Sequence, residues 1–356
     1  MDTMLDTTLA DTPLRSAMGL LMLDAIHGIG RVAVQKALGS FDTFGQLITA
    51  DDDAMKVCFN AKQRAAIRDT KIVDTAYRHA LKETSRASQI GAYIVSLYDA
   101  DYPERLKALE EPPFLLYTSG DLSIFDNAVG FVGTREPTMF GEKVAYGIAS
   151  AFAEEGWCVV SGLARGVDSL CHRAALDVGG TTCAVLPSGL DVYTSGAAME
   201  LAKRICENGG LIVSECGFGT EANRGSYIDR DRLITGLSLA TVFVQGETHS
   251  GSMHSVRYAI TQGKPVYVPN IPDKFLAEDI NHTARDLARM PLGQFASRLE
   301  WSGSVMEAVA KKPDRPAANA IMNRDDYPRV FEEIRALIPA RAMQHQRGFM
   351  DIVSTF

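Results

Sequence analysis

The sequence lacks any apolar run long enough to cross a membrane as a helix, and its first residues lack the basic start and apolar core of a secretory signal. We therefore expect a cytoplasmic protein. Cysteine is scarce, and the six residues of this type lie far apart with no Cys-x-x-Cys pair. Several fall in apolar segments, which favours buried reduced thiols, so we expect no disulfide framework, no metal site and no cofactor.

The chain also lacks a positive net charge and the usual catalytic signatures. Its formal net charge is -8 at pH 7, which argues against binding duplex DNA through a globally basic surface and requires any basic site to be local. There is no His-Glu-x-x-His pair, serine elbow, GxGxxG fingerprint or phosphate loop ending in Gly-Lys-Ser/Thr. Glu215 is the one candidate general base, and we interpret it as structural. We expect binding rather than catalysis.

The first part of the chain has a helical pattern. Residues 14–85 carry apolar residues at helical spacing, punctuated by Gly28, Gly30 and Gly39. The stretch "HGIGRVAVQKAL" predicts a hairpin turn that opens a helix. Glycine amides in helix-hairpin-helix turns can approach a DNA phosphate. A tight interhelical turn made possible by glycine explains the same residues without a ligand.

From residue 90 onward, short β-rich runs alternate with helical stretches. The runs are "AYIVSLY", "AVGFVG", "CVVSG", "TCAVLP", "LIVSE", "ATVFVQG" and "PVYVP", and helices are expected over 141–155, 168–178, 197–208 and 252–262. This alternation predicts an α/β fold: a doubly wound, mostly parallel sheet with a ligand crevice at the carboxyl ends of its strands. After about residue 300 the pattern lapses into a polar break, one amphipathic helix and a polar tail.

Four turns at the expected strand ends carry residues suited to an anion. They combine arginines with small residues, whose amides can approach a ligand, and with helix starts, which present a positive dipole end. A tyrosine beside paired guanidinium groups suits single-stranded nucleic acid, because charge holds the backbone and the ring stacks a base. The candidate ligands of phosphate or DNA are Gly133, Arg135, Ser161, Gly162, Arg165, Gly166, Tyr227, Arg230, Arg232, Ser250, Gly251 and Ser252.

Two more residues of the second turn, Asp168 and His172, are expected to be structural at this site, as a helix cap and a hydrogen-bonded packing residue. Taken singly, each arginine is also compatible with an ordinary surface position. Their shared placement at strand ends favours a phosphate site, since doubly wound sheets bind ligands there.

A family resemblance rests on segments that occur in order between about residues 90 and 270: "GFVGTREPTMFG", "WCVVSGLARGVDSLCHRAAL", "GGTTCAVLPSGLDV", "LIVSE", "DRDRLITGLS" and "SGSMHSVRYAITQGKPVYVP". Together they resemble the DNA-processing protein A family (DprA, also called Smf). The helical block with "HGIG" looks like that family's N-terminal sterile-alpha-motif-like or helix-hairpin-helix module. The expected domains are a small all-α domain over 1–85, an extended Rossmann-like domain over 86–300, and a linker, helix and tail of unknown role over 301–356.

The resemblance implies a single-stranded DNA-binding protein that forms a homodimer and loads the recombinase RecA onto incoming DNA in natural transformation. By position, Arg135 and Arg165 correspond to residues that grip phosphates, and Tyr227 stands where the family usually has a phenylalanine. The chain departs from the family at the usual Arg-Asn-Arg, which here contains Asp231, and the added carboxylate weakens the local positive field. Gln245 stands where an acidic residue is common, and no winged-helix module is evident in residues 317–356.

A dimer is also suggested by apolar residues on more than one face of the last expected helix and strand. If these elements were outermost, their surplus apolar surface would need a partner. Alternatively, residues 271–310 fold back and cover it. The residues concerned are Val256, Tyr258, Ala259 and Ile260 on the helix and Val266, Tyr267 and Val268 on the strand.

A different class of function competes with DNA binding. Phosphoribohydrolase-type enzymes, which bind or hydrolyse nucleotide derivatives, use a related Rossmann-like sheet with a PGGxGT turn followed by a glutamate. The corresponding segment here, "QGETHSGSMHS", lacks that turn but retains Glu247. A weaker alternative is a scaffold whose helical block and tail bind proteins.

Overall fold

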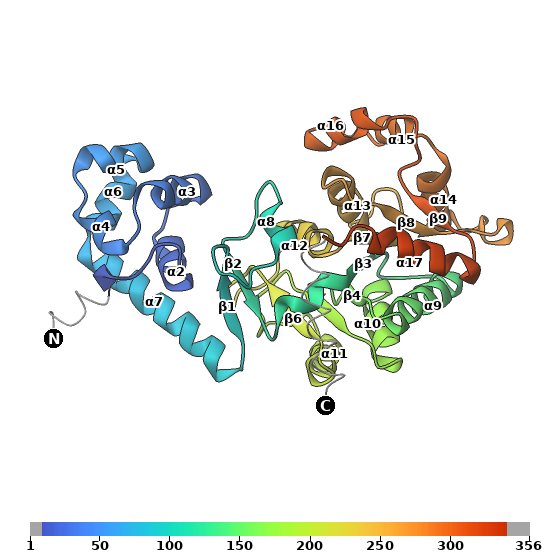
Figure 1. Cartoon of the computed structure of the whole chain (residues 1–356), viewed down its shortest axis with the longest axis horizontal. Coiled ribbons are helices and arrows are strands. Elements are labelled where there is room, and N and C mark those ends of the chain that lie inside the picture. The colour runs from blue at the N-terminus through green and yellow to red at the C-terminus, as the bar shows by residue number, and fades with distance from the viewer. Residues whose placement is uncertain (1–8, 340–356) are drawn as a thin grey trace.

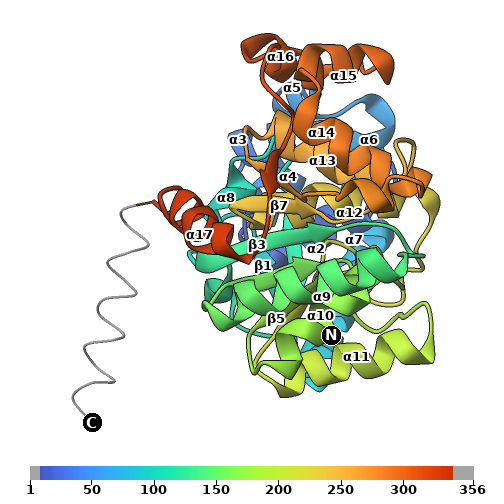
Figure 2. The same cartoon turned by 90° about the vertical axis from the view of Figure 1, so that its right-hand side faces the viewer.

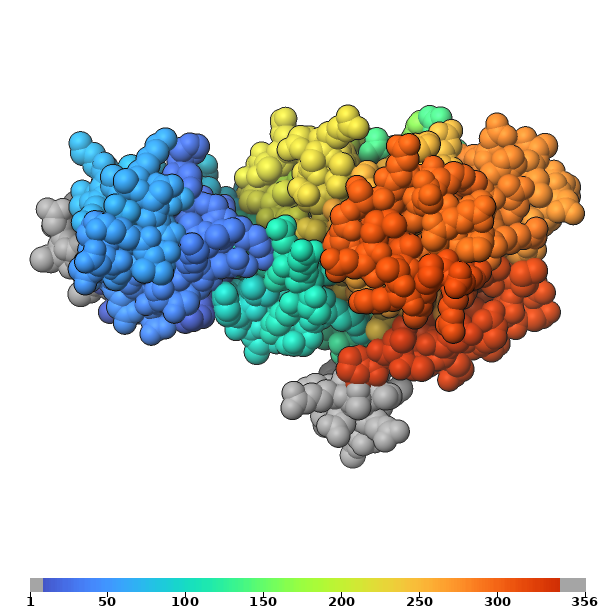
Figure 3. Space-filling model, turned by 90° about the horizontal axis from the view of Figure 1, so that it is seen from above, coloured from blue at the N-terminus to red at the C-terminus, as the bar shows by residue number. Residues whose placement is uncertain are grey.

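The computed structural model describes residues 9–339 as an elongated molecule, with a block of helices at its N-terminal end and an α/β body beyond it (Figures 1 and 3). Side-chain caps fix where several of the first helices begin: Ser16, Asp51 and Asn60 each accept a hydrogen bond from an amide in the first turn. The helices of this block are α2 (Ala17–Ala25), α3 (Arg31–Ser40), α4 (Phe44–Thr49), α5 (Asp52–Cys58), α6 (Ala61–Arg68) and α7 (Thr70–Gln89).

The body is built on a nine-stranded sheet of order β1-β2-β6-β5-β4-β3-β7-β8-β9. All neighbouring strands from β6 to β9 are parallel, whereas β1 pairs with β2, and β2 with β6, in antiparallel fashion. The chain places β4, β5 and β6 on one side of β3 and then returns to place β7, β8 and β9 on the other. The strands are β1 (Tyr93–Ser96), β2 (Leu115–Thr118), β3 (Ala128–Val132), β4 (Cys158–Ser161), β5 (Thr182–Val185), β6 (Leu211–Ser214), β7 (Ala240–Phe243), β8 (Val266–Pro269) and β9 (Asn319–Ile321).

Helices cover both faces of the sheet (Figure 2). On one face the ring of Phe152 packs edge-on against Phe131 of the sheet and Phe331 of the last described helix, with centroid distances of 5.6 and 4.9 Å. That face carries α9 (Met139–Glu154), α10 (Val167–Asp177), α11 (Gly196–Glu207) and α17 (Tyr327–Arg335). The other carries α8 (Glu104–Lys107), α12 (Arg224–Leu237), α13 (Ser252–Thr261), α14 (His282–Arg289), α15 (Leu292–Arg298) and α16 (Ser304–Lys311). Short 3-10 turns are η1 (Leu122–Asn127), η2 (Asp273–Phe275), η3 (Asp279–Asn281) and η4 (Arg324–Asp326).

The α/β prediction is confirmed, and each of the seven β-rich runs contains a strand. Two strands were missed, β2 and the three-residue β9, because the first lies in a proline-flanked segment and the second in the polar break. The expected turn around Arg230 and Arg232 is wrong: these residues lie within helix α12. Buried Arg230 and Asp231 interrupt the apolar pattern that marks a helix. The division into domains at residues 85 and 300 stays a prediction, and the expected tail beyond residue 339 lies outside the described residues.

The apolar surface that suggested a dimer is covered within the chain. Strand β8 is not outermost, because β9 pairs with it, and α16 packs against α13. Val256 and Val268 are fully buried, and Tyr267 retains only 1% of its exposure. Residues 271–310 therefore do fold back over this part of the sheet, and the physical reason for expecting a partner here is removed.

The remaining expectations from composition concern thiols and membrane helices. All six cysteines lie within the described part of the chain and are free thiols. Burial raises the pKa of the Cys171 and Cys183 thiols well above their usual value, as expected for unreactive residues. Between residues 9 and 339, no helix has both the length and the apolarity to span a bilayer.

Candidate nucleic-acid interface

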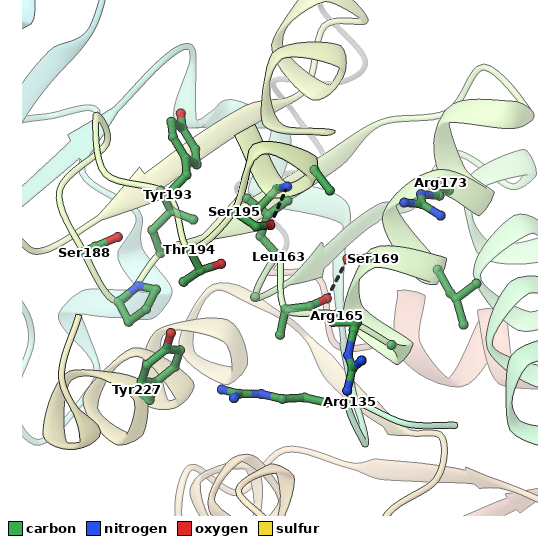
Figure 4. Close-up of a pocket in the computed structure, with 18 of the residues that line it drawn as sticks. Arg135, Leu163, Arg165, Ser169, Arg173, Ser188, Tyr193, Thr194, Ser195 and Tyr227 are labelled. Atoms are coloured by element: carbon green, nitrogen blue, oxygen red, sulfur yellow. Dashed lines mark hydrogen bonds between the residues drawn. The ribbon is translucent and has the colours of Figure 1, made fainter. Parts of the chain in front are cut away.

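A cavity of about 690 Å³ opens at the carboxyl ends of β3, β4 and β5. Its walls come from residues 135–137 after β3, residues 162–166 after β4, and residues 186–188 and 192–195 after β5. Figure 4 shows side chains from these turns and from α10 and α12 around the opening. Arg135, Arg165 and Arg173 all line it. The sheet thus brings Arg135 close to Arg165 and Arg173, which follow it by 30 and 38 residues in the sequence.

The turn after β4 has an unusual backbone. Leu163 has a φ of 59°, a left-handed conformation that is uncommon outside glycine. Gly166 has a φ of 86°, and a Cβ there would lie 2.4 Å from the carbonyl oxygen of Thr134. The same oxygen accepts a hydrogen bond of 3.1 Å from the amide of Val167. The glycine therefore allows the turns after β3 and β4 to touch, which brings Arg135 and Arg165 to one rim.

A buried charged network holds this turn from behind. The Asp168 carboxylate accepts hydrogen bonds from the amides of Gly162 at 3.2 Å and Ala164 at 3.4 Å, and Arg230 Nη1 lies 3.9 Å from the same carboxylate. A Cβ on Gly162 would lie 1.1 Å from Arg230 Nη1, so the arginine packs directly under the turn. Burial raises the pKa of Asp168 in spite of Arg230. The expectation that Asp168 caps its helix is wrong, because α10 begins after Gly166 without a side-chain cap and Asp168 instead holds the turn before it.

Arg135 and Arg165 themselves are accessible. The Arg135 Cζ lies 5.2 Å from the centroid of the Tyr227 ring, a cation–π arrangement that leaves the guanidinium directed into the cavity (Figure 4). Arg165 forms an ion pair with Glu136, and the two side chains are 74% and 79% exposed. Since an exposed pair of this kind is worth at most about 1 kcal/mol, a phosphate can compete for Arg165.

Arg232, grouped with these arginines by the sequence, has a different environment. Its Nη2 lies 2.5 Å from Oε2 of Glu215, and the two side chains are only 17% and 23% exposed. Burial raises the pKa of Glu215 despite this contact. Neither residue lines the cavity, and neither does Glu247. Glu215 is thus engaged structurally.

Other candidates lie beside or beneath the cavity rather than on its wall. The hydroxyl of Ser161 is buried and donates to the carbonyl of Phe131 at 2.7 Å. Ser250 Oγ lies 2.9 Å from Ser252 Oγ at the start of α13. Seven of the candidate residues chosen from the sequence do not line the cavity: Gly133, Ser161, Arg230, Arg232, Ser250, Gly251 and Ser252.

The crevice between β3 and β7, where a doubly wound sheet usually binds its ligand, is filled. Gln245 is fully buried there, and its Nε2 donates to Thr138 Oγ1 at 2.9 Å and to Asn281 Oδ1 at 2.6 Å. A Cβ on Gly141 would lie 2.1 Å from its Oε1. The Gln245 amide therefore fills the switch point, the place between β3 and β7 where the strand order reverses. The open cavity lies beside it, towards β4 and β5.

His172 is a packing residue, as the sequence suggested. Its Nδ1 lies 2.7 Å from the hydroxyl of Thr182, which itself donates to the carbonyl of Val159 at 2.6 Å. Because that hydroxyl proton is used, Nδ1 must donate, and Nε2 is left buried without a partner in the described chain. Burial, with a smaller effect of Arg230, lowers the pKa of His172 to about 3, so the ring is neutral at physiological pH.

Comparison with known proteins shows to which family this chain belongs. Residues 93–293, more than half of the chain, match the family described as DNA recombination-mediator protein A. The chain belongs to this family. It is 37% identical to Protein Smf of Synechocystis over 181 residues, which are 49% of this chain and 45% of that protein. It is 31% identical to DNA processing protein DprA of Bacillus subtilis over 179 residues, 50% of this chain and 60% of that protein. The chain thus spans about half the length of these relatives.

Solved structures of family members share the fold. DNA processing protein A of Streptococcus pneumoniae superimposes with a TM-score of 0.63 at 21% identity, covering 88% of this chain and 97% of that one. DNA processing protein A of Helicobacter pylori, described for its unique single-stranded DNA binding mode, gives a TM-score of 0.52 at 26% identity, covering 69% and 98%. At 21% identity, the similarity to the Streptococcus pneumoniae protein shows a shared fold and nothing more.

The cavity residues that the sequence analysis missed include Arg173, Tyr193 and Ser195. Arg173 lies two turns along α10 from Gly166, on the face that also presents Ser169, so helical spacing could have identified it. Tyr193 and Ser195 come from the irregular segment after β5, which has no periodic signal. Ser195 caps α11 by accepting a hydrogen bond of 3.2 Å from the amide of Ala198.

Proposed function

We propose that the cavity binds the backbone of single-stranded DNA, with Arg135 and Arg165 on phosphates. The observation that carries this proposal is the Arg135 guanidinium held over the Tyr227 ring at the cavity rim. Charge and an aromatic face at one place are the two elements that single-strand binding uses. Arg173 supplies a third cation. Glu136 and Glu142 also line the cavity, so its positive character is local and moderate.

A single strand fits this site better than a duplex. The cationic groups lie in a concavity on a chain of net charge -8, and a flexible single strand follows such a hollow more easily than a rigid duplex does. A base reaches the Tyr227 ring only when it is unstacked. The Helicobacter pylori relative, described for single-stranded DNA binding, supports the same assignment.

The wider role proposed is that of a cytoplasmic recombination mediator without catalytic activity. Family membership supports a DNA-processing role, and the proposal extends it to loading RecA on incoming strands in natural transformation, by a homodimer. The dimer rests on the family alone, because the apolar segment that suggested it is buried within the chain. Sedimentation at micromolar concentration tests the homodimer directly, and a monomer mass at that concentration would contradict it.

Fluorescence anisotropy with labelled single- and double-stranded oligonucleotides at two salt concentrations tests the main proposal. We expect tighter binding of the single strand, with an affinity that falls as salt rises because phosphate contacts release counterions. Equal affinity for both forms, or no binding at low salt, would contradict it. Release of a free base from nucleoside monophosphates would instead favour the phosphoribohydrolase-type enzyme.

A further inference from the structure

A second group, of two arginines, a histidine and a tryptophan, lies outside the cavity, on α12, α13 and the segment before α16. It consists of Arg224, His254, Arg257 and Trp301, named here the α13 track. None of the four lines the cavity. Trp301 also lies beyond residues 93–293, the part of the chain that matches the family.

The track begins where the cavity ends. Arg224 and Tyr227 are three residues apart in the first turn of α12, so they share a helix face, and Tyr227 is the cavity ring under Arg135. Helix α12 packs against α13, which carries His254 and Arg257 with the same spacing, and α13 packs against α16 (Figure 1). Helices in contact thus connect the cavity with Arg257, whose side chain reaches Trp301.

The far end of the track is a cation on an aromatic ring. The Arg257 Cζ lies 5.8 Å from the centroid of the Trp301 ring, and its Nη2 donates to the carbonyl of Ser302 at 3.4 Å. The Trp301 ring packs edge-on against Phe295, with a centroid distance of 5.7 Å. The ring is thus packed against Phe295, and the Arg257 guanidinium lies over the Trp301 ring. This repeats the arrangement of Arg135 and Tyr227.

The charges of the track are not compensated by the protein. Within residues 9–339, neither Arg224 nor Arg257 forms an ion pair. Burial, and then Arg257 and Arg224, lower the pKa of His254 below its usual value, so the positive charges of the track are those of the two arginines. Like charges held together without a counter-charge are unfavourable, and a bound anion relieves them.

We propose that single-stranded DNA leaves the cavity past Tyr227 and continues over the α13 track, with Arg224 and Arg257 on its phosphates and a base stacked on the Arg257–Trp301 pair. This rests on the proposed function of the cavity. A flexible polyanion with unstacked bases fits alternating cations and rings, whereas a small anion would use only one of them. A short strand occupies the cavity, and a longer one occupies both.

Two oligothymidines, of about five and about twenty nucleotides, distinguish the two parts of the path. Arg257→Ala should lower affinity for the long strand about tenfold and leave the short strand unchanged. Arg298→Ala is the matched control: its Cζ also lies over a ring, 5.4 Å from the Phe295 centroid, but the arginine is ion-paired to Asp286. It should bind both strands like the wild type. Thermal melting verifies that each variant is folded, and Arg257→Gln serves if the alanine variant is not.

Tryptophan fluorescence gives a second measurement that does not depend on a destabilising variant. The chain has two tryptophans, and Trp157 is buried, so quenching by DNA reports Trp301. The long strand should quench emission, the short strand should not, and Trp301→Phe should remove the response. If the short strand binds but the long strand neither quenches Trp301 nor depends on Arg257, the track is not a DNA path. If the short strand fails to bind at all, the cavity proposal fails instead.

Discussion

Four arginines that look equivalent in the sequence divide into two pairs in the structure. Arg135 and Arg165 stand at the cavity rim, where one lies over a tyrosine ring and the other in an exposed ion pair. Arg230 and Arg232 lie behind, with side chains 6% and 17% exposed and carboxylates within 3.9 and 2.5 Å. The first pair is free to exchange partners. The second is committed to holding the protein together.

The difference follows from the cost of burying charge. A guanidinium in the interior needs fixed partners, because solvent cannot replace them, and removal of either partner leaves the other uncompensated. At the rim, water and ions already screen the charge, so a phosphate displaces weak contacts. Burial, rather than residue type, therefore decides which arginines are free to meet an anion.

The largest expected effect comes from Arg230→Ala. Because this leaves Asp168 buried without its cation, we expect the free energy of unfolding to fall by about 3–5 kcal/mol in urea denaturation. Arg135→Ala is the matched exposed change and should alter stability by less than about 0.5 kcal/mol. If the Arg230→Ala protein is fully stable but no longer binds DNA, Arg230 contacts DNA directly and is not structural.

Asp231→Asn should stabilise the protein at neutral pH. Burial, partly offset by Arg230, raises the pKa of Asp231 from 3.8 to about 6. The wild type therefore loses stability as pH rises from 3.8 through 6, because the unfolded chain ionises first, whereas the asparagine variant does not. The variant should gain up to about 3 kcal/mol over the wild type between pH 4 and pH 7. Urea denaturation at the two pH values measures this, and an advantage that does not change with pH would contradict it.

Arg135→Ala and Arg165→Ala should each weaken single-stranded DNA binding by about 1–3 kcal/mol for every sequence tested and should flatten the salt dependence. A phosphate contact is lost in each case, not a base contact. Arg329→Ala, an arginine on α17 outside the cavity, is the control and should bind normally. Wild-type affinity in both folded variants would show that DNA binds elsewhere.

Tyr227→Ala should cost about 1–3 kcal/mol of DNA binding, because it removes both a stacking surface and the ring under Arg135. Tyr227→Phe keeps the ring and should bind nearly as well as the wild type. A large loss in the phenylalanine variant would show that the hydroxyl, rather than the ring, makes the contact.

The smallest effect is expected from Glu136→Gln. This change frees Arg165 from its exposed ion pair and removes one negative charge from the cavity wall. Affinity for single-stranded DNA should improve by less than about 1 kcal/mol, and only at low salt. Weaker binding in this variant would mean that the pair orients Arg165 rather than competing for it.

The sequence alone determined the α/β class, seven of the strands and the turns that contain Arg135 and Arg165, because these depend on local periodicity and on short glycine-rich motifs. It did not reveal that Arg230 lies under Gly162, that Gln245 fills the switch point, or that β9 covers β8. Those facts depend on contacts between residues far apart in the chain. Only the tertiary structure fixes which charges are buried, and burial separates the arginines that hold the cavity from those that can bind in it.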